Sequence, residues 1–357
     1  MERKDFIRYS LAGLGAAVML PSSLVSCTAG RKKVPMPSWT WYVARKNREH
    51  LAKDLKKLKR YGFEGVHLQG DDETMEQVVA LAGELDLRIH RWYVTLMNGN
   101  KEILEEHPDW YVVSREGRSS AEYPPYVPYY KWLCPNHQGV IDHLEKKMRE
   151  MASLAGLDGI HLDYIRFPDV ILPRGLWKKY DIVQDREYPR YDYCYCDVCR
   201  SKFAAEYGVD PLDLPDPAAD VAWRQFRYDS ITRLVGRLAA VVREHGKKIS
   251  AAVFPTPAIA RKLVRQAWDH WDLDAVFPMM YHNFYEKKIA WLEEAVREGE
   301  EALRGRFPLY AGLFVPAILP QEMPDAVRYV AKGEAQGLCL FRYGSMNDKH
   351  WKHFLAQ

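Results

Sequence analysis

The sequence lacks a strong excess of charge of either sign, because 51 Lys and Arg residues stand against 48 Asp and Glu residues. A formal charge of +3 on 357 residues is too small for the dense basic surface that a phosphate backbone requires, so nucleic acid is not expected as a partner. Hydrophobic residues make up 47% and charged residues 28%, which is typical of globular proteins and excludes disordered and collagen-like classes.

The sequence also lacks an apolar run of the roughly 20 residues that span a bilayer. The run from Leu11 to Leu20 is shorter, and it follows the basic residues Arg3, Lys4 and Arg8. This pattern predicts an export signal over residues 1–26. Its end, Leu24-Val25-Ser26-Cys27, resembles the bacterial lipoprotein signal, so we expect lipidation of Cys27 and attachment to the membrane through the lipid alone. An ordinary signal peptide with an incidental cysteine is the alternative.

A third feature that is missing is a Gly-x-Gly-x-x-Gly motif after the first expected strand, which argues against a doubly wound dinucleotide-binding sheet. After a tether over residues 27–37, short apolar runs alternate with helical patterns, which predicts βα units around a parallel sheet. The expected strands are 38–44, 63–70, 88–96, 158–167, 247–254, 273–281, 307–315 and 337–343. The expected helices are 48–61, 73–85, 138–155, 219–245, 259–270, 285–303, 321–334 and 347–356. Residues 38–357 are therefore predicted to form a single α/β domain, a (β/α)₈ TIM barrel.

Two connections are too long to be ordinary βα loops. Residues 97–137 follow the third expected strand and residues 169–218 follow the fourth, so both insertions begin at the carboxyl ends of strands. In a (β/α)₈ barrel these ends form the face that carries active sites. We therefore expect the two insertions to shape a functional site.

Phenylalanine is a minority of the aromatic residues, because 12 Phe stand against 22 Tyr and 11 Trp together. Tyr and Trp combine an apolar ring with a hydrogen-bonding group, which suits a ligand that is partly apolar and partly hydroxylated. The period of two along each strand directs several polar and aromatic side chains toward the barrel axis. The expected substrate-binding residues are Trp41, His67, Gln69, His90, Trp92, His161, Tyr164, Arg166, Tyr281, His282, Arg342 and Tyr343.

The fourth expected strand contains Asp158-Gly159-Ile160-His161-Leu162-Asp163-Tyr164-Ile165-Arg166-Phe167-Pro168. Asp163 faces the axis near the carboxyl end of this strand, which predicts a catalytic carboxylate; the alternative is an aspartate that pairs with a neighbouring His or Arg and fixes the strand end. Hydrolysis by side-chain carboxylates usually needs a second carboxylate, and the other strand ends do not supply one. The available candidates are Asp71, Asp72, Asp169 and Asp192, of which we select Asp71; the alternative for each is a solvated turn or cap residue. One carboxylate is sufficient if the substrate supplies its own nucleophile, as an acetamido sugar can.

The fourth-strand motif resembles that of the glycosyl-hydrolase-like proteins labelled family ten. The segments His107-Pro108-Asp109-Trp110 and Leu133-Cys134-Pro135-Asn136 are similar to the part of those proteins between strands three and four, and Asp274-Ala275-Val276-Phe277-Pro278-Met279-Met280-Tyr281 is similar to their sixth strand. The resemblance implies a carbohydrate-active barrel with Asp163 at the catalytic position.

The six cysteines include a Cys194-Tyr195-Cys196-Asp197-Val198-Cys199 run, and Cys134 lies upstream. Four thiolates can close a structural zinc site, so Cys134, Cys194, Cys196 and Cys199 are the expected ligands, and no organic cofactor is expected. The arrangement resembles the zinc cluster of family 42 β-galactosidases, although the Asn-Glu pair that ends their fourth strand is missing. Disulfides are the alternative in an oxidising compartment. Cys339 is expected to be a buried strand residue.

The sequence thus predicts a cell-envelope lipoprotein that hydrolyses glycosidic bonds in an oligo- or polysaccharide. A glycan-binding lipoprotein without activity is one alternative. A metal-dependent hydrolase that uses His67, His90, His161 and Asp163 is another.

Overall fold

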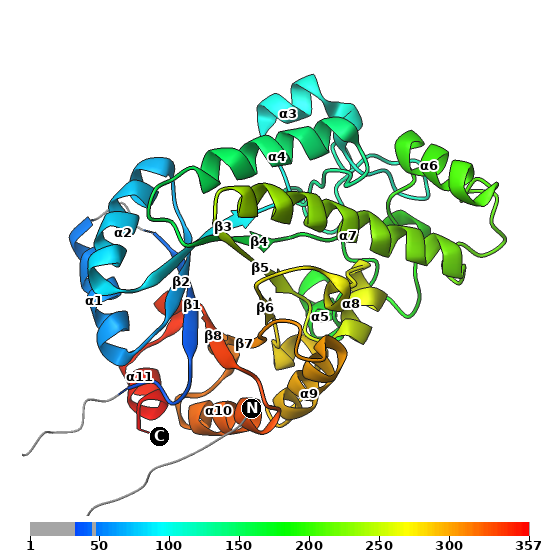
Figure 1. Ribbon diagram of the computed structural model, residues 1–357. Coiled ribbons are helices and arrows are strands. Elements are labelled where there is room, and N and C mark those ends of the chain that lie inside the picture. Colours follow the sequence, from blue (N-terminus) through cyan, green and yellow to red (C-terminus); the bar gives the residue numbers. More distant parts are fainter. Residues whose placement is uncertain (1–32, 45–47, 357) are drawn as a thin grey trace, which may run out of the picture. The chain divides into compact units, whose positions relative to one another are not determined.

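Eight parallel strands form the centre of the computed structural model, which describes residues 33–44 and 48–356 (Figure 1). The strands are β1 Ser38–Val43, β2 Gly65–Gln69, β3 Arg88–Val94, β4 Gly159–Asp163, β5 Lys248–Val253, β6 Ala275–Pro278, β7 Tyr310–Phe314 and β8 Gly337–Phe341. Their order is β6-β5-β4-β3-β2-β1-β8-β7. Every expected strand is present, although each is shorter than predicted, and the predicted (β/α)₈ architecture is confirmed.

The two ends of the sheet, β6 and β7, meet through isolated bridges rather than a continuous ladder. The bridges pair Val276 with Leu309 and Met279 with Gly312, and the amide of Met280 donates to the carbonyl of Gly312 at 2.9 Å. Gly312 allows this approach, because a Cβ atom there would lie 2.7 Å from the carbonyl oxygen of Pro278. The barrel is thus closed by a seam with fewer hydrogen bonds than its other strand pairs.

Helices surround the strands in the expected alternation. Those outside the insertions are α1 Arg48–Tyr61, α2 Asp72–Leu85, α4 Gln138–Ala152, α7 Val221–Glu244, α8 Pro257–Val264, α9 Trp291–Leu303, α10 Met323–Lys332 and α11 Asp348–Phe354. Two predicted helices extend six residues beyond the observed ones, 259–270 at its end and 285–303 at its start. Arg265 takes a left-handed conformation (φ 54°) and ends α8 early, and Glu286 (φ 52°) separates the 3₁₀ turn His282–Tyr285 from α9.

The two insertions have secondary structure of their own. The first contains α3 Lys101–Glu106 and the 3₁₀ turn Pro108–Trp110, and the second contains α5 Trp177–Tyr180, α6 Asp197–Tyr207 and the 3₁₀ turns Arg174–Leu176 and Pro189–Tyr191. An antiparallel bridge between Ser114 and Tyr193 joins the insertions directly. The neighbouring helices α4 and α7 pack against each other beside them (Figure 1).

Large side chains fill the barrel interior. One buried cluster consists of Trp39, Trp41, Ala252, Phe277, Tyr310 and Cys339, so the expectation of a buried Cys339 is confirmed. The outer face of the sheet packs on the helices through a separate, larger apolar cluster.

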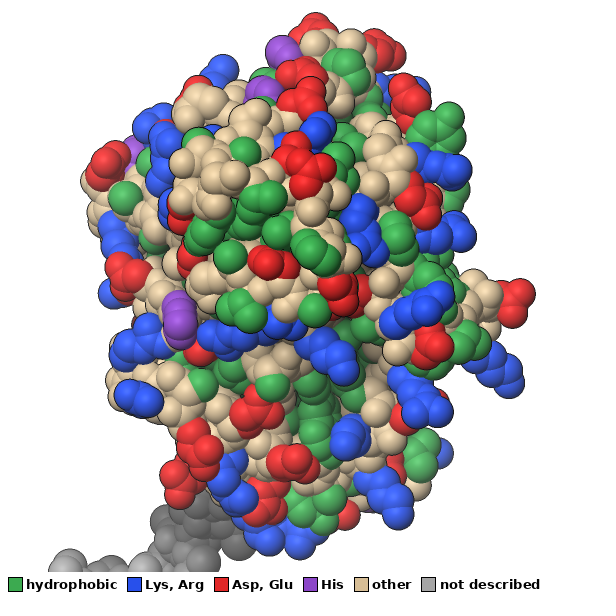
Figure 2. Space-filling model, turned by 90° about the vertical axis from the view of Figure 1, so that its right-hand side faces the viewer, with side chains coloured by type: hydrophobic (Ala, Val, Ile, Leu, Met, Phe, Trp, Pro, Cys, Tyr) green, Lys and Arg blue, Asp and Glu red, His purple; other side chains and the backbone are tan. Residues whose placement is uncertain are grey.

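On the face shown in Figure 2, Lys and Arg side chains are interspersed with Asp and Glu side chains. This mixture agrees with the near balance of charges in the sequence. Among the described residues, no helix is both long and apolar enough to cross a membrane. Residues 1–32, with the expected signal, Cys27 and most of the tether, lie outside the described part of the chain.

Candidate active site

Asp163 is the last residue of β4 and lies at the carboxyl end of the barrel, as predicted. One carboxylate oxygen accepts a hydrogen bond from the indole N–H of Trp92 at 2.9 Å, and the other accepts the amide of Tyr164 at 2.7 Å. Burial raises the pKa of Asp163, and it outweighs these two hydrogen bonds and the nearby Arg166 charge, which act in the opposite direction. A carboxyl group with a raised pKa is suited to donate a proton.

The backbone beside Asp163 is also unusual. Tyr164 has φ 52°, in the left-handed region that residues with a large side chain seldom occupy. This conformation turns the chain out of β4 and allows the Tyr164 amide to reach the carboxylate of its neighbour. Strain of this kind is concentrated at functional sites.

Asp163 lines a cavity of about 460 Å³ at this end of the barrel, which we call the Asp163 cavity. Such a volume is within the range of roughly 300–1,000 Å³ for small-ligand pockets. Strand ends and both insertions contribute to its wall. Residues that line it include Gln69, Trp92, Tyr126, Tyr130, Tyr164, Arg166, Asp169, Phe254, Tyr281 and Phe341. The combination of aromatic rings with a few polar groups fits a hydroxylated ring compound.

Asp169 is the second carboxylate in the wall, and it is already paired. Its Oδ2 accepts hydrogen bonds from Arg166, at 3.0 Å, and from the hydroxyl of Tyr130. Arg166 in turn donates to the Tyr130 hydroxyl at 2.8 Å, and its guanidinium group lies 4.8 Å from the ring centroid of Trp132. Asp169 and Arg166 therefore largely neutralise each other, whereas no cation of the described chain is in hydrogen-bond contact with Asp163.

Tyr281, three residues beyond the end of β6, also reaches the cavity. Its hydroxyl is buried and has no hydrogen-bond partner among the described residues. Burial and the neighbouring carboxylate of Asp163 raise the pKa of Tyr281, so the phenol keeps its proton. A buried hydroxyl without a partner costs free energy, and a ligand in the cavity would satisfy it.

The four cysteines of the predicted metal site come together. Their sulfur atoms all lie within 4.8 Å of one another, and Cys134 Sγ is 3.6 Å from Cys196 Sγ and 3.5 Å from Cys199 Sγ. Sulfurs at about 2.3 Å from a central zinc ion would lie about 3.8 Å apart, whereas a disulfide requires about 2.05 Å. The described cysteines form no disulfides, and the buried cluster could bind a metal.

The family of the protein follows from a comparison of its sequence with family models. A model described as glycosyl hydrolase-like 10 matches residues 40–320, which include β4, both insertions and the Asp163 cavity. The chain belongs to the glycosyl hydrolase-like 10 family. The expected family resemblance is thereby confirmed, while a search of curated proteins found no match.

Solved structures with this fold include several glycosidases. A β-galactosidase from the Antarctic haloarchaeon Halorubrum lacusprofundi has a TM-score of 0.63 at 14% identity, over 90% of this chain and 57% of that chain. The catalytic domain of β-amylase from Paenibacillus polymyxa has a TM-score of 0.60 at 13% identity, over 90% and 97%. A GH42 β-galactosidase from G. stearothermophilus has a TM-score of 0.59 at 9% identity, over 90% and 55%.

At these identities the likeness shows the fold, and the chain spans little more than half the length of the two β-galactosidases. Membership of the glycosyl hydrolase-like 10 family, together with this fold, supports a glycoside hydrolase.

The structure places some predicted substrate-binding residues of this glycosyl hydrolase-like 10 protein around the Asp163 cavity and others elsewhere. Five of them line the cavity: Gln69, Trp92, Tyr164, Arg166 and Tyr281. Trp41, His67, His90 and His161 face the barrel axis as expected but are buried in the interior below it. The alternation along a strand predicts which side chains point to the barrel axis, but not how far along the axis each one lies. Each of the three histidines precedes a cavity residue or Asp163 by two positions, so it points the same way but lies deeper in the barrel.

The interior histidines also do not form a catalytic metal site. His161 Nε2 accepts a hydrogen bond from the indole N–H of Trp41 at 3.0 Å, and His161 Nδ1 shares a hydrogen bond with Ser250 Oγ at 2.9 Å. His90 contacts the same serine hydroxyl, and burial lowers its pKa to about 3. Among the described residues, the His, Cys, Asp and Glu side chains with ligand atoms close enough to share a metal are the four cysteines. The predicted alternative of a metal on His67, His90, His161 and Asp163 therefore lacks a ligand set.

The remaining predicted residues lie outside the cavity wall. Asp71 is exposed and caps helix α2 by accepting the amide of Thr74 at 2.9 Å, so the structure does not bring it to Asp163. Tyr343 donates to Asp54 at 2.7 Å and packs on Tyr42, because the side chain points to the helices and away from the axis. Arg342 is exposed beside it, and His282 is buried at the start of its 3₁₀ turn.

The structure adds cavity residues that the strand pattern did not indicate. Tyr126 and Tyr130 come from the first insertion, where no helical or strand period predicts their direction. The stretch Tyr123-Pro124-Pro125-Tyr126-Val127-Pro128-Tyr129-Tyr130 is rich in tyrosine and proline, and this composition is the available signal. The hydroxyl of Tyr126 donates to the backbone carbonyl of Asp169 at 2.7 Å, so the two insertions are joined at the cavity.

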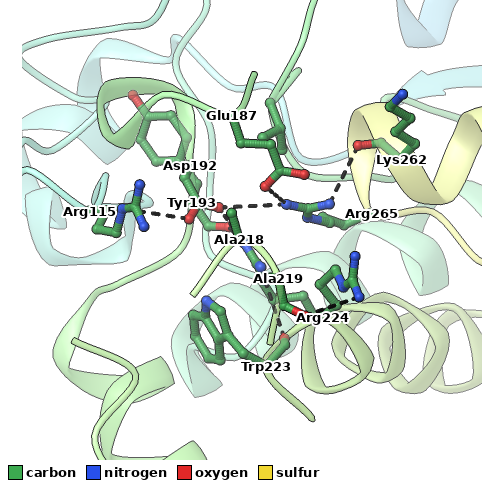
Figure 3. Close-up of polar contacts among 12 residues, drawn as sticks. Arg115, Glu187, Asp192, Tyr193, Ala218, Ala219, Trp223, Arg224, Lys262 and Arg265 are labelled. Carbon is green, nitrogen blue, oxygen red and sulfur yellow. Dashed lines mark hydrogen bonds and ion pairs between the residues drawn. The ribbon is translucent and has the colours of Figure 1, made fainter. Parts of the chain in front are cut away.

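A buried ionic cluster around Asp192 anchors the second insertion. The carboxylate of Asp192 pairs with Arg227, lies 3.9 Å from Arg265 and 4.0 Å from Arg115, and accepts the hydroxyl of Tyr195 at 2.7 Å. Figure 3 shows Arg115 and Arg265 on opposite sides of Asp192. Burial acts to raise the pKa of Asp192, but the two guanidinium groups of Arg227 and Arg265 outweigh it and lower the pKa. Asp192 is fully buried in this Asp192 cluster and is not in the cavity wall.

Proposed function

We propose that this glycosyl hydrolase-like 10 protein hydrolyses glycosidic bonds of an oligo- or polysaccharide, with Asp163 as the catalytic general acid and base. The observation that carries the proposal is the placement of Asp163: a carboxyl group with a raised pKa lies at the end of β4, in a cavity lined by aromatic rings. Family membership and the glycosidase fold support the same reaction class.

The neighbours of Asp163 have distinct tasks in this proposal. The N–H groups of Trp92 and Tyr164 each donate to one oxygen of Asp163, which fixes the plane of the carboxyl group. Neither group is a base, so neither takes the proton of Asp163. The ring of Trp92 offers a flat face to a sugar ring, Tyr126 offers an aromatic edge, and Gln69 offers an amide to the hydroxyl groups of the sugar. The unpartnered Tyr281 hydroxyl donates a hydrogen bond to the substrate near the reacting oxygen.

Asp169 positions Arg166 in this scheme and is not a second catalytic carboxylate, because its Oδ2 is engaged by Arg166 and Tyr130. The same observation favours a second candidate function, the binding of a glycan without hydrolysis. Most glycosidases require two carboxylates that flank the scissile bond. Turnover of a glycan therefore distinguishes the two candidates.

The test compares the wild type with Asp163→Asn on a panel of soluble oligo- and polysaccharides, with new reducing ends as the readout. We expect cleavage of at least one glycan and a loss of about a thousandfold in kcat/KM in the variant, the contribution typical of a lost general acid. Asp71→Asn is the matched control, because it changes the same charge at an exposed helix cap and should retain activity. Equal activity of Asp163→Asn and wild type would refute the role of Asp163, and binding without turnover would select the glycan-binding protein.

We further propose that the protein is an exported lipoprotein of the cell envelope, with the signal over residues 1–26, lipid on Cys27 and a tether over 27–37. The apolar run from Leu11 to Leu20 and the position of Cys27 after Ser26 support this. Radiolabelled palmitate should enter the wild type and not a Cys27→Ser variant. Labelling of both proteins to the same extent would contradict the lipid site.

Finally, we propose that the four-cysteine cluster binds a structural zinc ion. Four buried sulfurs within 4.8 Å of one another support this, and a site with four protein ligands has no open position for a substrate. The bound ion would join residues of both insertions, since Cys134 lies near the end of the first and the other three cysteines lie in the second. The side chain of Asn136, which donates to Cys199 Sγ at 3.2 Å, would support the ligand from outside.

A further inference from the structure

A second hollow adjoins the Asp163 cavity, and we call it the distal hollow. Its volume is about 830 Å³, and Glu122, Lys131, Tyr180, Asp181, Arg190 and Tyr191 are among the residues that line it. All of these residues belong to the two insertions, so a barrel with ordinary loops would have no such hollow. The volume is sufficient for a ligand of small-molecule size by the usual range of pocket volumes.

The distal hollow is continuous with the Asp163 cavity through shared residues. Tyr126, Val127 and Tyr180 line both. Tyr126 is fixed in this shared wall, because its hydroxyl donates to Asp169 and accepts from Gln184 at 2.9 Å, and its ring stacks on Tyr191 at a centroid distance of 4.5 Å. A ligand that extends beyond the Asp163 cavity would therefore meet a rigid aromatic edge and then the distal hollow.

The chemistry of the distal hollow suits a hydroxylated chain of no particular charge. Glu122, Asp181 and Arg190 are exposed and form no ion pairs within the described chain, so their hydrogen-bonding groups are available. Two are acidic, whereas Arg190 and Lys131 are basic, so the hollow has no single sign that would select an anion or a cation. The rings of Tyr180 and Tyr191 add apolar faces beside these polar groups.

We infer that the distal hollow is a second sugar-binding subsite, which holds the part of a glycan chain that extends beyond the residue bound at Asp163. The inference rests on the proposed function and makes it more specific: the preferred substrate is a chain of several sugars rather than a disaccharide. Specificity for long chains then resides in the insertions, and the reaction resides in the barrel.

The experiment measures the binding of cello-, malto- and chito-oligosaccharides, from disaccharide to octasaccharide, to the full chain carrying Asp163→Asn by calorimetry. Affinity should increase with chain length while the Asp163 cavity fills, and it should increase further once the oligosaccharide is long enough to reach the distal hollow. The double variant Glu122→Ala, Arg190→Ala should weaken binding of long oligosaccharides about tenfold, the effect of one to two lost hydrogen bonds to charged groups, and that of disaccharides less than twofold. If Asp163→Asn does not fold, the comparison is made with Asp163 intact: initial rates of cleavage are measured across chain lengths for the wild type and for the double variant Glu122→Ala, Arg190→Ala.

Arg186→Ala is the matched control, because Arg186 is exposed in the same insertion and is not a lining residue of the distal hollow. It should leave the length dependence intact. Affinity that does not change with length, or an equal effect of Arg186→Ala and the double variant, would overturn the inference. Length-dependent binding without any cleavage by the wild type would sustain the inference and reject hydrolysis. Equal kcat/KM for short and long chains would reject the subsite and sustain hydrolysis.

Discussion

Two buried aspartates of this chain have opposite surroundings. Asp163 accepts hydrogen bonds from two neutral N–H groups, and burial raises its pKa. Asp192 is paired with Arg227 and has Arg265 and Arg115 nearby, and these charges lower its pKa against the effect of burial. The sequence predicts Asp163 as the catalytic carboxylate and offers Asp192 as one of four candidates for a second one.

The different surroundings of the two aspartates indicate different roles, catalysis for Asp163 and stability of the fold for Asp192. A carboxylate whose charge is balanced by buried cations stabilises the fold and has no transferable proton. Asp163 has no such cation, so its pKa is raised and it holds its proton to a higher pH than an exposed aspartate does, beside a cavity. Asp192 thus fixes the second insertion to helices α7 and α8. Asp163 costs stability in its ionised form, which is expected of a group whose proton is used in a reaction.

The largest expected effect is the loss of stability in Asp192→Asn. Removal of the negative charge leaves Arg227 and Arg265 buried without their shared partner, which should lower the free energy of unfolding by about 3–5 kcal/mol. Urea denaturation followed by circular dichroism gives the value. The control Asp185→Asn alters an exposed carboxylate of the same insertion and should change stability by less than about 0.5 kcal/mol.

Asp163→Asn provides the sharp contrast to that variant. Its stability should stay within about 1 kcal/mol of the wild type, because the amide can keep an oxygen acceptor for one neighbouring N–H group and has no charge to desolvate. A loss as large as that of Asp192→Asn would show that the two aspartates have the same structural role and would end the comparison.

Removal of one cysteine ligand should have the next largest effect. Cys134→Ser should reduce bound zinc from one ion per chain to a small fraction and lower the free energy of unfolding by about 2–3 kcal/mol. Elemental analysis and denaturation of the same samples measure both quantities. Cys339→Ser serves as the control for zinc content, since Cys339 is buried in β8 away from the cluster. Full zinc content in Cys134→Ser would disprove this ligand.

Stability as a function of pH should distinguish the two aspartates by sign. The pKa of Asp192 is lowered below its ordinary value near 3.8, so its stabilising contribution is present above that pH and disappears as the pH falls through the lowered pKa. The pKa of Asp163 is raised, so its contribution is present below about 3.8 and disappears as the pH rises through the raised pKa. Each slope is at most about 1.4 kcal/mol per pH unit.

Denaturation of the wild type and the two Asn variants between about pH 3 and pH 7 tests these slopes. The advantage of the wild type over Asp192→Asn should shrink as the pH falls. Relative to Asp163→Asn, the wild type should instead become less stable as the pH rises. Slopes of the same sign for both pairs would contradict the assigned pKa directions.

Tyr281→Phe should have the smallest effect on stability. It adds a neutral hydroxyl group to the comparison of the two carboxyl groups. The hydroxyl has no partner among the described residues, so its removal should leave the protein equally stable or more stable by about 1 kcal/mol. The value of kcat/KM should nevertheless fall about tenfold, the effect of one lost hydrogen bond to the reacting substrate. Unchanged kcat/KM would remove Tyr281 from the proposed site.

The architecture and the position of Asp163 could be predicted from the sequence, because each depends on a local pattern. Alternation along β4 directs Asp163 to the axis, and apolar runs alternating with helical patterns define the barrel. No local pattern in the sequence shows how far along the barrel axis a side chain lies. His67 and His161 are therefore predicted at the site, whereas the structure places them in the buried interior.

The insertions were less predictable, because their residues are placed by partners distant in the sequence. Asp192 is compensated by arginines of α7 and of the turn that follows α8, and nothing beside Asp192 in the sequence indicates this. Tyr126 and Tyr130 reach the cavity by contacts with Asp169 across the two insertions. By contrast, the spacing of three of the four cysteines is local, and the predicted grouping is present.

The seam between β6 and β7 has a consequence for how the cavity changes shape. The cavity wall extends across the seam, because Met279 and Tyr281 follow β6 and Phe314 ends β7. Strand pairs with few cross-strand hydrogen bonds open locally at lower free energy than continuous ladders. Amide hydrogens of Val276 and Met280 should therefore exchange with deuterium sooner than those inside β2 or β3, and a bound glycan should slow them. The barrel would then admit its substrate by transient widening at the one place where its sheet is not continuous among the described strands.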